Sequence, residues 1–147
     1  MVSTMTREGC VVLLGDFSNE RLDLKSIGRD FCWSVTQSLD LSGLREIGRS
    51  RTVVAVLVQA GWAEALNTSW SNALRAVRAA APRARIIVCH KVDQSDSRAA
   101  IVGAGAFGVL LSPLAHSEVR QSLGFVWASK IRSLKCAPSD ASGVVSA

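Results

Sequence analysis

The sequence predicts an α/β protein with a parallel sheet whose two faces are both covered by helices. Four short runs are almost continuously apolar and rich in β-branched residues, which is typical of strands buried on both faces. Between these runs the apolar residues recur three and four positions apart, the spacing of an amphipathic helix. Strand and helix alternate five times, which predicts a doubly wound, five-stranded sheet in a three-layer sandwich. A chain of 147 residues is long enough for one such domain and too short for two.

The strands are marked with different clarity. The clear apolar runs are 11–14, 52–58, 85–89 and 109–111. A weaker strand is predicted at 33–39, where apolar and polar residues alternate only in part.

The helices follow from apolar stripes and their end signals. Ser18 is predicted to cap the first helix, whose stripe is Leu24, Ile27 and Phe31. Residues 41–47 form a weaker helix, and the stripe from Leu66 to Ala81 is ended by Pro82. The remaining predicted helices are a short one at 97–104 and a long final one at 119–134.

The composition indicates an ordinary globular domain. We expect the domain at 9–135, between flexible tails at 1–8 and 136–147, the second of which would suit a linker to an absent output domain. The first residues are polar and are not typical of a secretory signal, and no apolar run is long enough to span a membrane. These features favour a cytoplasmic protein without a membrane partner.

The net charge of +5 raises the question of an anionic partner. The basic residues are dispersed along the chain and no basic run is interleaved with aromatic residues, which argues against direct nucleic-acid binding. The four cysteines share no short spacing, so no metal site or redox motif is predicted, and Cys10 and Cys89 look like core residues. The run from Gly103 to Gly108 fits GxGxxG, but a helix is predicted before it and a strand after it, the reverse of a dinucleotide fingerprint. No cofactor is therefore expected.

Three phrases of the sequence resemble the receiver domain of two-component response regulators. They are VVLLGDFSNERL at 11–22, ALRAVRAAAPRARIIVCHK at 73–91 and GAFGVLLSPL at 105–114, and the similarity covers about 9–130. The resemblance implies a flavodoxin-like sheet in strand order 2-1-3-4-5. It also implies a cis peptide bond between Ser112 and Pro113.

Receivers carry their chemistry at the carboxyl ends of the strands, and the resemblance places altered residues there. The acid pair after the first strand becomes Gly15 and Asp16, and the phosphoacceptor aspartate falls on Val58 or Gln59. The remaining two positions, a Ser or Thr and a Lys in receivers, become His90 and Ser112. Neither Val58 nor Gln59 can form an acyl phosphate, and one carboxylate is a poor start for a magnesium site. The resemblance thus implies a vestigial pocket and no enzyme activity, with Glu64 and Asp93 as the nearest replacement acids.

The expected function is that of a regulatory domain that binds proteins, in bacterial signalling or transcription regulation. Degenerate receivers of this kind resemble the N-terminal domains of some sigma-54-dependent activators and of some pilus-assembly ATPases. The last helix is the expected interaction face and a possible homodimer contact, through Trp127, Ile131 and Leu134.

Three questions stay open at this level. Trp62 could be an exposed partner contact or could fold over the pocket. The chain could instead be a doubly wound nucleotide- or cofactor-binding enzyme with a ligand near Gly103 to Gly108. It could also sense a small ligand in the pocket of Asp16, Val58 and His90.

Overall fold

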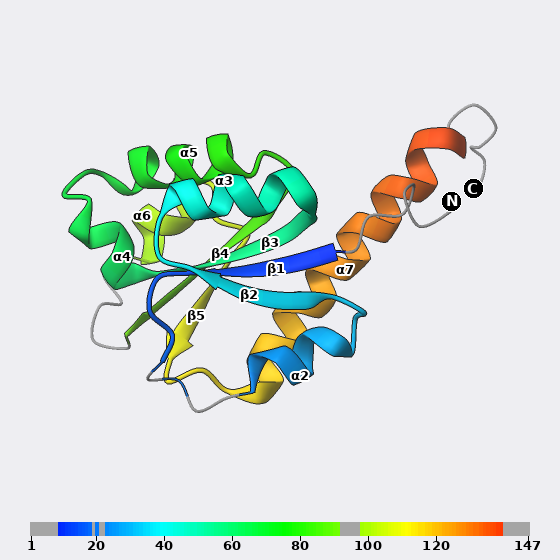
Figure 1. Ribbon diagram of the computed structural model, residues 1–147, viewed down its shortest axis with the longest axis horizontal. Coiled ribbons are helices and arrows are strands. Elements are labelled where there is room, and N and C mark those ends of the chain that lie inside the picture. Colours follow the sequence, from blue (N-terminus) through cyan, green and yellow to red (C-terminus); the bar gives the residue numbers. More distant parts are fainter. Residues whose placement is uncertain (1–8, 19, 21–22, 92–97, 140–147) are drawn as a thin grey trace.

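A five-stranded, all-parallel sheet in the order β2-β1-β3-β4-β5 forms the centre of the computed structural model (Figure 1). The model describes residues 9–18, 20, 23–91 and 98–139, with the backbone alone for Lys91 and for 131–139. The strands are β1 (Gly9–Leu14), β2 (Ser34–Ser38), β3 (Thr52–Gln59), β4 (Arg85–Lys91) and β5 (Gly108–Ser112). The predicted fold class and strand order are confirmed.

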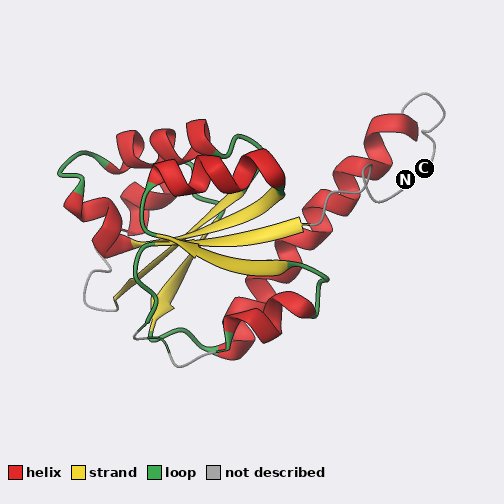
Figure 2. Cartoon of the chain, in the orientation of Figure 1, coloured by secondary structure: helices red, strands yellow, loops and turns green. Residues whose placement is uncertain are grey.

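The helices form two layers, one on each face of the sheet (Figures 1 and 2). On one face lie α2 (Leu24–Arg29) and α7 (His116–Ser139). The other face carries α3 (Leu41–Ser50), α4 (Ala60–Ala65), α5 (Trp70–Ala80) and α6 (Arg98–Gly103). Because α7 continues to Ser139, it extends past the sheet, and the domain end at residue 135 stays a prediction.

Each face of the sheet has its own hydrophobic core. Leu44, Leu74 and Ile101 are fully buried on the α3–α6 side, whereas Ile27 and Val119 are fully buried on the α2–α7 side. Residues 53–58 of β3 are all buried, and they divide between the two cores: Val53, Val56 and Val58 enter the α3–α6 core, and Val54, Ala55 and Leu57 enter the α2–α7 core. This two-sided burial explains why the strand runs are continuously apolar.

The start of α2 differs from the sequence prediction. The helix is capped by Asp23, whose side chain accepts a hydrogen bond from the Ser26 N–H at 3.1 Å. The predicted cap, Ser18, is wrong: its own N–H donates to the Asp16 carboxylate at 2.9 Å. Both residue types favour N-caps, and the one directly before the helical stripe takes the position.

The stripe predicted from Leu66 to Ala81 does not form one continuous helix: Leu66 lies between α4 and α5, and only the part from Trp70 onward belongs to α5. Asn67 has a φ of +56° between α4 and α5, so the chain turns there, and Leu66 is 41% exposed. A second helix begins after Ser69, which accepts from the Asn72 N–H at 3.1 Å. Trp62 lies in α4, not in a loop, and packs against the core.

Two further predictions concern the segment around β5. Gly103 ends α6 and Gly108 begins β5, so within the described residues the glycine run follows a helix and precedes a strand, as expected. The Ser112–Pro113 peptide bond is cis, which confirms that prediction. In the part of the chain that the structure describes, no helix is long and apolar enough to cross a membrane.

Candidate functional site

A small pocket of about 190 Å³ opens at the carboxyl edge of the sheet. The ends of parallel strands meet at this edge, and ligands of doubly wound proteins bind there. The predicted residues Asp16, Gln59, His90 and Ser112 all line the pocket, while Gly15 adjoins it. The other lining residues are Phe17, Glu20, Ala60, Gly61, Glu64 and Cys89.

The sequence analysis left Val58 and Gln59 as the two candidates for the phosphoacceptor position, and only one of them lines the pocket. Val58 is fully buried in the core beneath α3–α6 and does not line the pocket. Gln59, the last residue of β3, does. The side chain at this strand end is therefore an amide.

The Gln59 amide is engaged by the backbone of the neighbouring loop. Its Nε2 donates to the Asp16 carbonyl at 2.7 Å, and its Oε1 accepts from the Asp16 N–H at 3.2 Å. A carboxylate could not reproduce this pair of bonds, because an ionised acid has no hydrogen to donate. Gln59 thus ties the β1–α2 loop to the end of β3.

Gly15 is required by the same arrangement. Its φ of +117° lies where side-chain-bearing residues rarely occur. A Cβ at this position would stand 2.8 Å from the Gln59 Cβ and 3.2 Å from the Trp62 Cβ. A second acid at residue 15 would consequently be strained and would collide with the side chains that fill the space.

The carboxylate that remains, Asp16, faces solvent. Hydrogen bonds from Ser18, from its side chain first and its backbone second, lower the pKa of the Asp16 carboxyl from 3.8. Asp16 is therefore ionised at neutral pH.

Glu20 is a pocket residue that the sequence analysis missed. Its Oε2 accepts from the Ser112 hydroxyl at 2.6 Å, and its Oε1 accepts from the Leu114 N–H at 2.9 Å. Both carboxylate oxygens are thus occupied at the end of β5. An acidic side chain has taken up the hydrogen-bonding groups of this strand end.

The end of β4 contributes two buried side chains, Cys89 and His90, which are 4% and 2% exposed. Burial raises the pKa of the Cys89 thiol well above its usual range, and the negative charge of Glu20 raises it further. The thiol is consequently protonated and a poor nucleophile. His90 occupies a place where the resemblance expects a small hydroxyl.

The residues of the pocket do not fit the magnesium ion that a receiver fold suggests. Both oxygens of Glu20 bind protein groups, and Asp16 accepts from Ser18. Within the described residues, no group of three or more His, Cys, Asp or Glu side chains could hold a metal ion. Of the two replacement acids considered, Glu64 lines the pocket and Asp93 lies outside the described residues.

Comparisons with known proteins agree with this architecture. No protein-family model matches the sequence, and no curated protein matches it closely. Solved structures do match: the receiver domain of the TMAO respiratory response regulator TorR superposes with a TM-score of 0.66 at 21% identity, over 82% of this chain and 98% of that one. The chain has the fold of receiver domains.

Two further receiver structures show the same match. A Thermotoga maritima response regulator has a TM-score of 0.66 at 16% identity, over 84% of this chain and 99% of that one. The receiver domain of the Pseudomonas aeruginosa sensor histidine kinase PA1611 has a TM-score of 0.59 at 17% identity, over 84% and 99%. That receiver was solved with magnesium coordinated in its active-site cleft.

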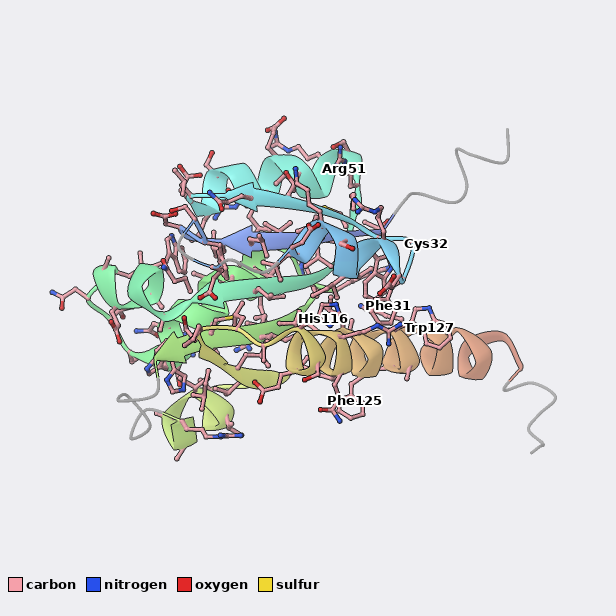
Figure 3. The ribbon with its side chains drawn as sticks, turned by 90° about the horizontal axis from the view of Figure 1, so that it is seen from below. Phe31, Cys32, Arg51, His116, Phe125 and Trp127 are labelled. Atoms are coloured by element: carbon pink, nitrogen blue, oxygen red, sulfur yellow. The ribbon has the colours of Figure 1, made fainter. Side chains whose placement is uncertain are left out.

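Large apolar side chains are exposed on the last helix. Phe125 is 59% exposed and points away from the sheet, whereas Trp127 is 46% exposed and lies on the side of α7 that faces Phe31 and Cys32 (Figure 3). The other two predicted interface residues, Ile131 and Leu134, have side chains outside the described part.

Proposed function

We propose that this domain is a regulatory module that acts through protein binding and is not switched by phosphorylation of a strand-end aspartate. The observation that carries the proposal is the pair of hydrogen bonds between the Gln59 amide and the Asp16 backbone, at 2.7 and 3.2 Å. An amide at the end of β3 cannot act as the nucleophilic carboxylate that phosphoryl transfer to a receiver requires, which supports the proposal. The Glu20 carboxylate at Ser112 supports the same conclusion, since it adds negative charge where a receiver balances phosphate with a cation.

The pocket itself does not favour a nucleotide-binding or small-ligand function. Its volume of about 190 Å³ is below the range of roughly 300–1,000 Å³ that is usual for ligand sites. Its lining includes the acids Asp16, Glu20 and Glu64, which repel an anion. A doubly wound enzyme with a phosphorylated cofactor at this edge is therefore the weaker hypothesis.

The last helix supports the interaction part of the proposal. Phe125 and Trp127 expose large rings, and such exposed apolar groups are typical of protein contacts. Val102 of α6 and Phe107 before β5 are also exposed, at 53% and 39%. We propose that α7 binds a partner or an output domain, or a second copy of this chain, in bacterial signalling or transcription regulation in the cytoplasm.

Light scattering of the full chain tests the homodimer form of this proposal. The unmodified protein should show a concentration-dependent dimer, and Trp127→Glu should shift it to a monomer, because a buried unpaired charge is costly. Gln121→Glu is a matched control, since Gln121 is exposed on the same helix and the charge change is identical. It should leave the dimer intact.

A monomer at high concentration in the unmodified protein would rule out the homodimer. A dimer that survives Trp127→Glu would show that the contact lies elsewhere. Circular dichroism of each variant confirms that the helix content is unchanged.

A further inference from the structure

A second and larger pocket, of about 490 Å³, lies at the opposite edge of the sheet, where the strands begin. It is formed by the end of α3, the first residues of β3 and the turn after α5. Four of its lining residues are arginines: Arg45, Arg49, Arg51 and Arg83. This size is within the usual range for small-molecule sites.

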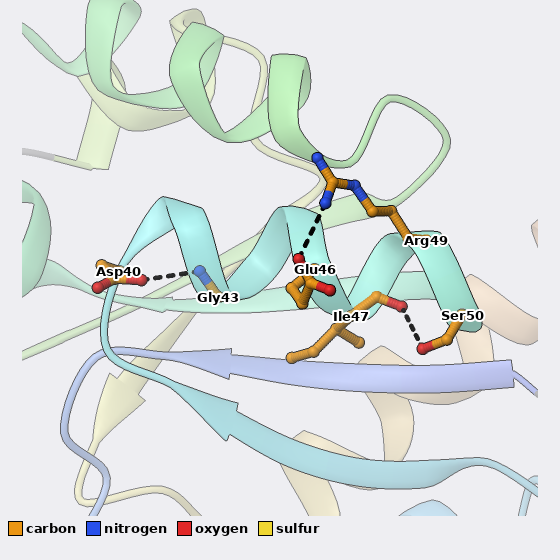
Figure 4. A network of polar contacts seen from close by, with 6 residues as sticks. All are labelled: Asp40, Gly43, Glu46, Ile47, Arg49 and Ser50. Carbon is orange, nitrogen blue, oxygen red and sulfur yellow. Dashed lines mark hydrogen bonds and ion pairs between the residues drawn. The ribbon is translucent and has the colours of Figure 1, made fainter.

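The arginines are weakly compensated by protein acids. Arg49 pairs with Glu46 at 3.0 Å, but both side chains are about three-quarters exposed, so the pair is a weak one (Figure 4). Arg51 donates to the Ser34 hydroxyl at 3.4 Å. Among the described residues, neither Arg45, Arg51 nor Arg83 forms an ion pair with a carboxylate.

The carbonyl ends of two helices also face this region, because α3 ends at Ser50 and α5 ends at Ala80. Each helix end carries roughly half a negative charge, which accounts for part of the arginine content. The positive charge of the four guanidinium groups is larger than the combined negative charge of the two helix ends and Glu46. The pocket therefore keeps a net positive charge. Lys130 lies next to the pocket, where its ammonium group donates a hydrogen bond to the Arg83 carbonyl. The pKa of this ammonium group is lowered, first by burial and then by the positive charges of Arg85 and Arg83.

The floor of the pocket is apolar. Val53, Ala80 and Ala81 are at least nine-tenths buried, and Pro82 stands exposed beside them. Gly48 of α3 leaves room above this floor, since a Cβ there would meet only the Ala80 carbonyl, at 3.8 Å. The pocket thus combines a narrow apolar floor, of which Pro82 is the exposed part, with a rim of cations.

We propose that this pocket binds a nucleotide, with its base against Val53, Ala81 and Pro82 and its phosphates among the arginines. Guanidinium groups bind phosphate by paired, charge-assisted hydrogen bonds. The site is separate from the acidic pocket at the other edge of the sheet and does not depend on the proposed function of that pocket.

Calorimetric titration of the full chain with ATP, in the absence of magnesium, tests the proposal. The expected result is saturable one-site binding that weakens as salt is raised. Pyrophosphate should bind more weakly than ATP because it lacks a base, and adenosine should give no detectable heat because it lacks phosphates.

Charge variants show whether the pocket is the site. Arg45→Gln and Arg83→Gln should each weaken ATP binding by about tenfold, since each removes a charged phosphate contact. Arg75→Gln is the matched control: Arg75 is exposed on α5 and does not line the pocket, yet its loss changes the net charge equally. Gly48→Met, which adds an apolar chain without a charge change, should block the site.

Several results would overturn the proposal. These are the absence of saturable binding, an equal loss in Arg75→Gln, and an unchanged affinity in Gly48→Met. If pyrophosphate binds as tightly as ATP, the base does not contribute to binding, and the proposed contact between the base and the apolar floor is wrong. An affinity for single-stranded oligonucleotides that rises with their length would assign the arginines to a nucleic-acid backbone instead.

Discussion

The contact between Glu20 and the end of β5 gives a stability prediction that can be worked from distances. One carboxylate joins the loop after β1 to the Ser112 hydroxyl at 2.6 Å and to the Leu114 N–H at 2.9 Å. Because the site is only partly buried, each bond should contribute about 1 kcal/mol, which is less than the roughly 1.5–3 kcal/mol of a well-buried hydrogen bond to a charged group. Glu20→Ala should therefore lower the free energy of unfolding by about 2 kcal/mol.

The two partners can be separated by a double-mutant cycle. Ser112→Ala should cost about 1 kcal/mol, and the double variant should cost about 1 kcal/mol less than the sum of the two single changes. Glu20→Gln should be milder than Glu20→Ala, since an amide oxygen still accepts one bond. Glu46→Ala, which removes an exposed ion pair with Arg49, should change stability by less than about 0.5 kcal/mol.

Urea unfolding followed by circular dichroism measures these differences as shifts of the midpoint at constant slope. A coupling energy near zero between Glu20 and Ser112 would refute the contact. A loss in Glu20→Ala no larger than that in Glu46→Ala would refute the claim that Glu20 holds the two loops together.

Three further predictions concern other pocket residues. Gly15→Ala should destabilise the fold by about 2 kcal/mol or more in urea unfolding, because a positive φ and the contact with Gln59 both oppose a Cβ; a neutral effect would contradict the loop geometry. Iodoacetamide with peptide mapping should modify the exposed Cys32 quickly and the buried Cys89 only after unfolding, and rapid labelling of Cys89 in the native protein would show that its thiol is accessible. An NMR titration should give Asp16 a pKa below 3.8, so the stabilisation from its ionised form is present at neutral pH and is lost as the pH falls through that value; Asp16→Asn should remove this part of the acid sensitivity.

The elements that sequence patterns predict well are those set by burial. The continuous apolar residues 53–58 are buried on both faces of β3, so their pattern led directly to a parallel sheet. The break at Asn67 was missed because Leu66 continues the helical spacing although it lies outside both helices. Local apolar spacing does not reveal where the backbone turns.

The pocket was predicted in its location but not in its bonding. Gln59, His90 and Ser112 lie where the strand order places them. Glu20 escaped notice because its partner Ser112 is 92 positions away and no pattern around residue 20 marks it. The role of Gln59 toward the Asp16 backbone is likewise a long-range contact, 43 positions apart, that only the folded chain reveals.

Incubation of the full chain with acetyl phosphate and magnesium, followed by intact mass spectrometry, tests most directly whether the pocket can be phosphorylated. Gln59 offers no carboxylate, Gly15 excludes a second acid, and Ser112 is held by Glu20, so nucleophile, metal ligand and balancing cation are all replaced. We predict no stable gain of a phosphoryl group, and acid-lability mapping distinguishes any phosphohistidine on His90. A magnesium-dependent gain of one phosphoryl group, mapped to an Asp or Glu beside β3, would contradict the proposal.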